Sequence, residues 1–185
     1  MKRALADEDW DLKAVTTGEI IERSKARDLL RLIAEATWHC GDPGMQFDTT
    51  INDWHTVPNT GRINASNPCS EYMSLDDSAC NLASINLMKF LDDNGNFLIE
   101  QFKHAVRVLI IAQDIIVQNS SYPTDKIQIN ANAYRELGLG FANLGALLMS
   151  QGLAYDSEEG RAWAGAISAL MCGHAYEVSA QIAKE

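Results

Sequence analysis

The stretch from Gly61 to Leu87, GRINASNPCSEYMSLDDSACNLASINL, joins a polar segment to a segment with the pattern of a strand. The first part, Arg62 to Tyr72, has no helical period and contains Pro68, so it is predicted to be irregular. The second part, Ser78 to Leu87, is rich in small residues and predicts a closely packed strand. Residues 66–71, SNPCSE, are therefore expected to form a loop between ordered elements.

The SNPCSE loop carries an amide, a thiol and a carboxyl at alternate positions. In an extended segment alternate side chains point to one side, so Asn67, Cys69 and Glu71 are predicted to converge on one small molecule. Pro68 restrains the backbone next to Asn67. A lone cysteine in an ordered loop is more often a small buried apolar residue, but these neighbours favour a chemical role.

The chemistry that this trio favours is hydrogen-atom transfer. A carboxylate beside a thiol raises the pKa of the thiol, because the negative charge disfavours the thiolate. Cys69 is therefore poorly placed beside Glu71 to act as an ordinary thiolate nucleophile. The pair is better suited to a reaction in which the sulfur moves a hydrogen atom and the carboxylate moves a proton.

The chain on both sides of the loop predicts a mixture of helices and strands, recognised by the spacing of apolar residues. The predicted elements are helices over Glu19–Trp38, over Phe97–Val117 and from Glu158 almost to the C-terminal end, a strand over Met45–Ile51, and a turn at residues 40–44, CGDPG. Asp156 or Ser157 is the predicted cap of the last helix. The glycines of Leu137–Gly145 lack a GxGxxG motif or a Walker lysine, so they are interpreted as allowing close packing.

The composition is that of a globular protein. Hydrophobic residues make up 46% and charged residues 22% of the 185, and no apolar run approaches the ~18 residues of a membrane span. The N-terminal segment MKRALADEDWDLKAV turns acidic where a secretory signal would be apolar, so a cytoplasmic location is expected. The net charge of −10, without a basic stripe, argues against nucleic-acid binding.

The four cysteines, Cys40, Cys69, Cys80 and Cys172, contain no CxxC pair. A zinc site built from His39, Cys40, His55 and Cys80 would lack any recognisable ligand spacing, so no metal is expected. His55 is expected to make a structural hydrogen bond, and His104 and His174 to serve packing or the surface.

The stretch 61–87 resembles the finger loop and following strand of the catalytic chain of ribonucleotide reductase, and is most similar to class II, the adenosylcobalamin-dependent enzymes. Residues 40–56, CGDPGMQFDTTINDWHT, and residues 137–161, LGLGFANLGALLMSQGLAYDSEEGR, also resemble this family. The resemblance implies an α/β fold that is part of a ten-stranded α/β barrel. Residues 1–185 are then a central fragment of the catalytic barrel domain.

The resemblance also implies roles for individual residues. Cys69 becomes the thiyl radical that removes the ribose 3′ hydrogen, Glu71 accepts the proton of the 3′ hydroxyl, and Asn67 hydrogen-bonds the sugar hydroxyls. Cys80 matches one of the two thiols that reduce the substrate. The residues expected to contact substrate are Ser66, Asn67, Pro68, Cys69, Ser70 and Glu71.

By the same resemblance, adenosylcobalamin is the expected cofactor, a ribonucleotide the substrate and a thioredoxin-type protein the reductant. The family's partner cysteine for Cys80 lies on an earlier strand, and neither Cys40 nor Cys172 matches it. The chain is therefore expected to need the remaining barrel segments for activity. Fragment and split-gene product stay open, as do two alternatives: part of a class I reductase whose radical comes from a metal-containing subunit, and an inactive module that only binds another subunit.

Overall fold

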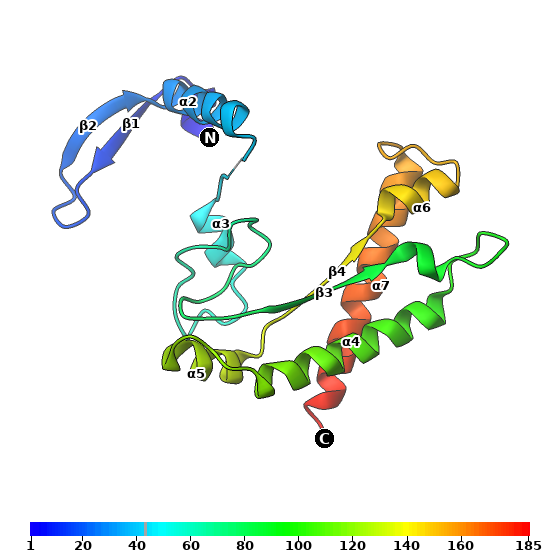
Figure 1. Ribbon diagram of the computed structural model, residues 1–185. Coiled ribbons are helices and arrows are strands. Elements are labelled where there is room, and N and C mark those ends of the chain that lie inside the picture. Colours follow the sequence, from blue (N-terminus) through cyan, green and yellow to red (C-terminus); the bar gives the residue numbers. More distant parts are fainter. Residues whose placement is uncertain (43) are drawn as a thin grey trace. The chain divides into compact units, whose positions relative to one another are not determined.

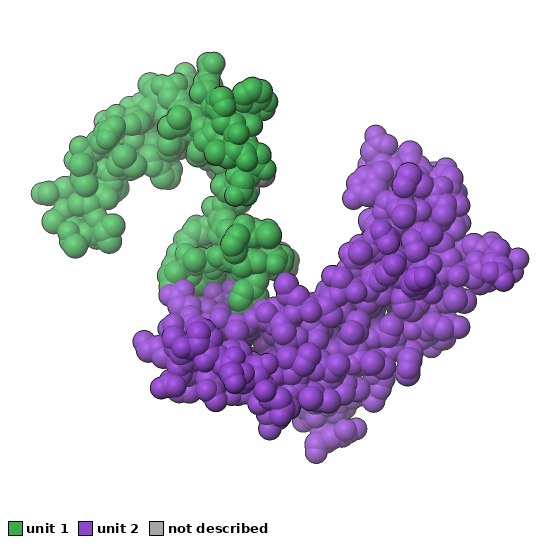
Figure 2. Space-filling view, in the orientation of Figure 1, with its two compact units in different colours: residues 1–73 green, residues 74–185 purple. Residues whose placement is uncertain are grey.

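The computed structural model of the protein describes residues 1–42 and 44–185, and these form two compact units, residues 1–73 and 74–185 (Figures 1 and 2). Helices and strands alternate irregularly along both units. In chain order they are α1 (Lys2–Leu5), β1 (Asp9–Lys13), β2 (Ile20–Lys25), α2 (Ala26–Cys40), α3 (Asp48–Asp53), β3 (Asn81–Asn86), the 3-10 helix η1 (Leu87–Phe90), α4 (Ile99–Asn119), α5 (Asp125–Tyr134), β4 (Leu137–Ala142), α6 (Leu144–Ser150) and α7 (Glu158–Ile182).

The first unit begins with an antiparallel hairpin of β1 and β2, in which Asp9 pairs with Lys25. Gly18 has a φ of 75°, a left-handed conformation that glycine adopts readily, and it helps to turn the chain between the two strands. The prediction of a helix beginning at Glu19 is therefore wrong for the segment Ile20–Lys25. The β-branched Ile20 and Ile21 favour a strand once a hairpin partner is present.

The remainder of that prediction is confirmed by α2, which covers Ala26–Cys40. The helix ends at Gly41, whose φ of 66° and hydrogen bond to the Thr37 carbonyl form a left-handed C-terminal cap. Of the predicted turn at residues 40–44, Pro43 lies outside the described residues.

The predicted strand over Met45–Ile51 is wrong, because Asp48–Asp53 form helix α3. Phe47 and Ile51, which fit the alternation of a strand, are also four residues apart and so share one face of a helix. The Ile51 amide donates to the Phe47 carbonyl at 2.9 Å. Over so few residues the two periods coincide, and hydrogen bonding to distant residues decides between them.

The second unit contains the parallel pair β3 and β4, in register from Asn81 opposite Leu137 to Asn86 opposite Ala142. The predicted strand near Ser78–Leu87 and the predicted long helix are confirmed by β3 and α4. The last predicted helix is α7, and Ser157 caps it by accepting a hydrogen bond from the Gly160 amide at 2.9 Å.

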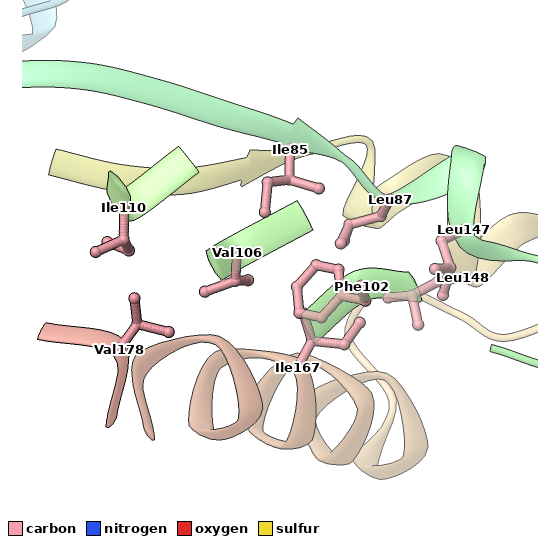
Figure 3. Close-up of a cluster of buried hydrophobic side chains, with 9 residues drawn as sticks. All are labelled: Ile85, Leu87, Phe102, Val106, Ile110, Leu147, Leu148, Ile167 and Val178. Atoms are coloured by element: carbon pink, nitrogen blue, oxygen red, sulfur yellow. The ribbon is translucent and has the colours of Figure 1, made fainter. Parts of the chain in front are cut away.

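One hydrophobic core holds the second unit together. Figure 3 shows its layers, with Ile85 of β3 above Val106 of α4 and Ile167 of α7 below. Phe102 of α4 is fully buried at the centre of the core. Its ring lies edge-on to the ring of Phe97, with 5.3 Å between the ring centroids. The cluster consists of Ile85, Leu87, Phe102, Val106, Ile110, Leu147, Leu148, Ile167 and Val178.

The interpretation that glycines of residues 137–145 allow close packing is confirmed at Gly138 in β4. A Cβ atom at this position would lie 2.3 Å from Cδ2 of Leu82 and 3.1 Å from Sγ of Cys80. The absence of a side chain at residue 138 therefore leaves room for the Leu82 side chain and the Cys80 sulfur beside β4.

Both units combine helices and strands, so the expected α/β fold is confirmed. The described strands form two two-stranded sheets, and the ten-stranded barrel stays a prediction. Among the described helices, none is both long enough and apolar enough to cross a membrane.

Candidate active site

The loop that carries Cys69 is closed at its base by an antiparallel bridge between Ser66 and Met73. At its tip the Ser70 amide donates to the Asn67 carbonyl at 3.1 Å, and Ser70 has a left-handed φ of 65°. This is a turn, so the prediction of an extended segment is wrong. Pro68 and Cys69 occupy the two central positions of the turn, and proline suits the first of these because its φ is fixed near −65°.

Asn67 holds the loop in shape. Its side-chain Oδ1 accepts a hydrogen bond from the backbone N–H of Tyr72 at 3.0 Å. The backbone N–H of Asn67 donates to the Tyr72 carbonyl at 3.4 Å. Within the described part of the chain its Nδ2 group makes no hydrogen bond, so it can donate to a ligand. The Oδ1 atom of Asn67 therefore stabilises the loop, and its Nδ2 group is available to donate to a ligand.

Cys69 and Glu71 are both exposed on this loop. Neither side chain forms a hydrogen bond or an ion pair with any described residue. The structure thus places both groups where a second molecule can reach them. Their convergence with Asn67 on one substrate stays a prediction.

Gln46 supports the loop through a contact that the sequence analysis does not predict. Its Nε2 donates to the hydroxyl of Ser66 and, at 3.0 Å, to the hydroxyl of Ser70. One amide group therefore links both sides of the loop. Because the partners lie 20 and 24 residues away, no local pattern could reveal the contact.

A second amide, Asn52 of α3, anchors the chain that leads into the loop. Its Oδ1 accepts from the Ile63 amide at 3.0 Å, and its Nδ2 donates to the Ile63 carbonyl at 3.1 Å. The Ile63 side chain is only 4% exposed. These hydrogen bonds attach the backbone of Ile63, three residues before Ser66, to the C-terminal end of α3.

His55 makes the structural hydrogen bonds expected of it. Its Nδ1 accepts from the Val57 amide at 3.4 Å, so Nε2 carries the proton and donates to the Gly61 carbonyl at 3.1 Å. The zinc alternative through His39, Cys40, His55 and Cys80 gains no support, because no three His, Cys, Asp or Glu side chains among the described residues are grouped to hold a metal ion.

Cys80 lies in the second unit, directly before β3, and is half-buried. Its thiol donates to the carbonyl of Asn81, with Sγ 3.5 Å from the oxygen. The sulfur also lies beside β4, because a Cβ atom at Gly138 would be 3.1 Å from it. The Cys80 sulfur thus donates to the backbone beside β3 and lies near Gly138 of β4, and no disulfide joins the cysteines of the described residues.

Comparison with known protein families gives a match of residues 4–185 to the ribonucleotide reductase barrel domain. The chain belongs to this family. The resemblance of residues 61–87 is thereby confirmed, and the match includes both Cys69 and Cys80.

Curated relatives agree with this assignment. The chain is 56% identical over 178 residues to the vitamin B12-dependent ribonucleotide reductase of Streptomyces clavuligerus, covering 94% of this chain and 18% of the relative. It is 57% identical over 158 residues to that of Rhodopirellula baltica, covering 85% and 15%. The vitamin B12-dependent ribonucleoside-diphosphate reductase of Mycobacterium tuberculosis is 40% identical over 143 residues, covering 77% and 20%. The chain therefore spans between 15% and 20% of the length of these relatives.

Proposed function

We propose that residues 1–185 are a central part of the ten-stranded catalytic barrel of a class II ribonucleotide reductase, which converts ribonucleotides to deoxyribonucleotides by thiyl-radical chemistry. The observation that carries the proposal is an exposed Cys69 at the tip of a closed turn, in a chain that matches this family over residues 4–185. An exposed thiol on a loop held by hydrogen bonds is suited to enter a pocket that other polypeptide completes.

In this proposal Cys69 removes the hydrogen atom from the ribose 3′ carbon, Glu71 accepts the 3′-hydroxyl proton, and the Nδ2 group of Asn67 donates to a sugar hydroxyl. The other residues of the Ser66–Glu71 loop line the substrate. Hydrogen transfer needs reacting atoms within ~3–3.5 Å of one another, which explains why the loop would be braced. The hydrogen bonds from Gln46 to Ser66 and Ser70 supply that bracing.

The second half of the reaction is reduction. The 2′ hydroxyl leaves as water, and two thiols supply two electrons and two protons as they become a disulfide. Cys80 is one of these thiols in the proposal, and a cysteine on another part of the barrel is the other. A thioredoxin-type protein then reduces the disulfide in the cytoplasm.

Adenosylcobalamin is the proposed cofactor, since the relatives are named for vitamin B12. When bound it supplies the radical, a chemistry that ordinary side chains lack. The pocket beside α3, lined by residues such as Ile51, Trp54 and Ile63, has a volume of about 270 Å³. Pockets for drug-sized ligands measure roughly 300–1,000 Å³, and cobalamin is larger than such ligands. This pocket does not fit the cofactor, and no residue of the chain is assigned to hold it.

Assembly of this chain with the polypeptide that completes the barrel tests the proposal. Deoxyribonucleotide formation is expected to require adenosylcobalamin and a dithiol, and the isolated chain is expected to show none. Turnover that instead depends on a metal-containing subunit would replace the proposal with a class I reductase. Assembly without turnover, in any of these conditions, would favour a module that only binds another subunit.

A further inference from the structure

Gln113 of α4 is a polar residue inside the second unit, with a side chain only 2% exposed. Its Nε2 donates two hydrogen bonds, to the carbonyl of Asn81 at 3.1 Å and to the carbonyl of Gly138 at 2.9 Å. The Asn81 side chain returns a hydrogen bond to the Gln113 carbonyl at 3.1 Å. One buried amide thus joins α4 to both strands of the parallel pair.

The two carbonyls held by Gln113 belong to the residues that enclose the sulfur of Cys80. The Asn81 oxygen also accepts the Cys80 thiol, with 3.5 Å between oxygen and sulfur. A Cβ atom at Gly138 would lie only 3.1 Å from the same sulfur. The Nε2 group of Gln113 therefore fixes the backbone on two sides of the Cys80 thiol.

Packing alone does not account for an amide at this place. Gln113 Oε1 and Asn81 Oδ1 are both buried and accept no hydrogen bond from any described residue. A buried acceptor without a donor is unfavourable, and methionine would fill a similar volume without this cost. An apolar side chain would also lack the two hydrogen bonds from Nε2, which satisfy the carbonyls of Asn81 and Gly138.

We propose that Gln113 is a positioning residue for Cys80, a proposal that rests on the redox role given to Cys80 above. When two thiols become a disulfide, they release two protons and two electrons to the substrate, and Cys80 loses the S–H group that donates to Asn81. Gln113 continues to donate to that carbonyl, so the backbone around the sulfur stays bonded in both redox states. The amide holds the sulfur in one place while its chemistry changes.

The test uses Gln113→Met in the assembled reductase, with Gln118→Met as the matched control. Gln118 lies on the same helix, is exposed, and makes no hydrogen bond with a described residue. In Gln113→Met the Asn81 and Gly138 carbonyls lose the hydrogen bonds from Gln113, and the sulfur becomes more mobile. Alkylation of Cys80 by iodoacetamide, followed by peptide mass spectrometry with Cys69 as the internal reference, is expected to accelerate roughly threefold or more relative to the control.

Steady-state kinetics supply the second readout. The kcat of Gln113→Met is expected to fall on the order of tenfold with KM unchanged, because misplacement of a reacting group slows chemistry more than binding. A folded Gln113→Met enzyme with the Cys80 alkylation rate and kcat of the control would overturn the proposal.

Gly138→Ala replaces Gln113→Met if that variant does not assemble. Its methyl group would press on the Cys80 sulfur, while the nearby Leu82 side chain, 69% exposed, can move aside. A changed Cys80 alkylation rate is expected, and an unchanged rate contradicts the positioning of the sulfur by these backbones. Full turnover in Cys80→Ser would instead refute the redox role of Cys80. The alkylation rates would still show whether Gln113 positions the Cys80 sulfur.

Discussion

The two compact units differ in what holds them together. Residues 74–185 enclose a continuous core, whereas the buried apolar side chains described in residues 1–73 are Ala4, Ala26 and Ile63. The first unit depends instead on the β1–β2 hairpin and on amide side chains such as Asn52 and Gln46. The loop with Cys69 thus lies in the unit with little core of its own, while Cys80 lies in the well-packed unit.

The difference fits a unit whose apolar surface is covered by other parts of a barrel. Trp38 and Trp54 of the first unit are 80% and 83% exposed, and Leu32 is 62% exposed. Large exposed apolar side chains commonly mark surfaces that bind other protein. We expect the remaining barrel to stabilise the first unit more than the second.

Phe102→Ala is expected to destabilise the second unit strongly, whereas a comparable substitution in the first unit is not. Removal of this fully buried ring leaves a cavity and should lower the free energy of unfolding by about 3–5 kcal/mol. Phe47→Ala, in the first unit, removes a ring that is 51% exposed and should cost less than about 1 kcal/mol. Urea unfolding followed by circular dichroism measures both, and equal losses would contradict the difference between the units.

A smaller effect is expected from Gly160→Ala at the start of α7. Alanine favours helices, but its Cβ would lie 2.7 Å from the Ala154 carbonyl and 3.1 Å from the Tyr155 carbonyl, and backbone cannot easily yield. The clash should outweigh the helix preference and destabilise by about 1–3 kcal/mol. Gly165→Ala on the same helix meets no atom within 4 Å and should stabilise by up to about 1 kcal/mol. Thermal unfolding of the two variants in the same direction would refute this account of the packing.

Asn52→Leu should affect only the first unit. It removes both hydrogen bonds to Ile63, which leaves a buried backbone donor and acceptor unpaired at a local cost of about 1–3 kcal/mol. Hydrogen exchange should show loss of protection at the Ile63 amide, with no change in α4 or α7. The control is Asn59→Leu, since Asn59 is exposed and makes no described side-chain hydrogen bond. Faster exchange throughout residues 74–185 would show that the units are not independent.

The smallest effect concerns Asp92, in a turn of the second unit. The Asn96 side chain, followed by the backbone amides of Asn96, Asn94 and Gly95, lowers the pKa of the Asp92 carboxyl by hydrogen bonding to its charged form. Its contribution to stability is therefore present above the unfolded pKa of about 3.9 and is lost as the pH falls through the lower folded value. Asp92→Ala should remove this part of the acid dependence, which unfolding midpoints between neutral and acidic pH would measure. An identical acid dependence in the variant would contradict the assignment.

The same contrast explains what the sequence could predict. α4 and α7 are recognisable because their apolar residues repeat over a length that matches the core they build, whereas β3 is recognisable from its strand-like pattern of small residues. In the first unit, Ile20–Lys25 and Asp48–Asp53 are short, and their conformation depends on pairing with β1 and on distant hydrogen bonds. Gln46 and Gln113 were missed for a similar reason, because the hydrogen-bonding partners of each lie 20 or more residues away.

At the loop, the residue types of Asn67, Cys69 and Glu71 predict a chemical role, and this role stays a prediction. The contacts that support the loop are not predictable from the same residues. The alternation of residue types predicts an extended segment, whereas Pro68 at the first central position and the left-handed Ser70 form a tight turn.

The turnover of Cys69→Ser in the assembled reductase tests whether Cys69 carries the radical. Cys40→Ser is the control, since Cys40 is another exposed cysteine of the first unit. With adenosylcobalamin and a dithiol present, Cys69→Ser should form no deoxyribonucleotide above background, because a serine hydroxyl cannot replace the thiol as the source of the radical that accepts the 3′ hydrogen atom. Cys40→Ser should turn over as the unmodified enzyme does. Substantial deoxyribonucleotide formation by a correctly assembled Cys69→Ser enzyme would contradict the account.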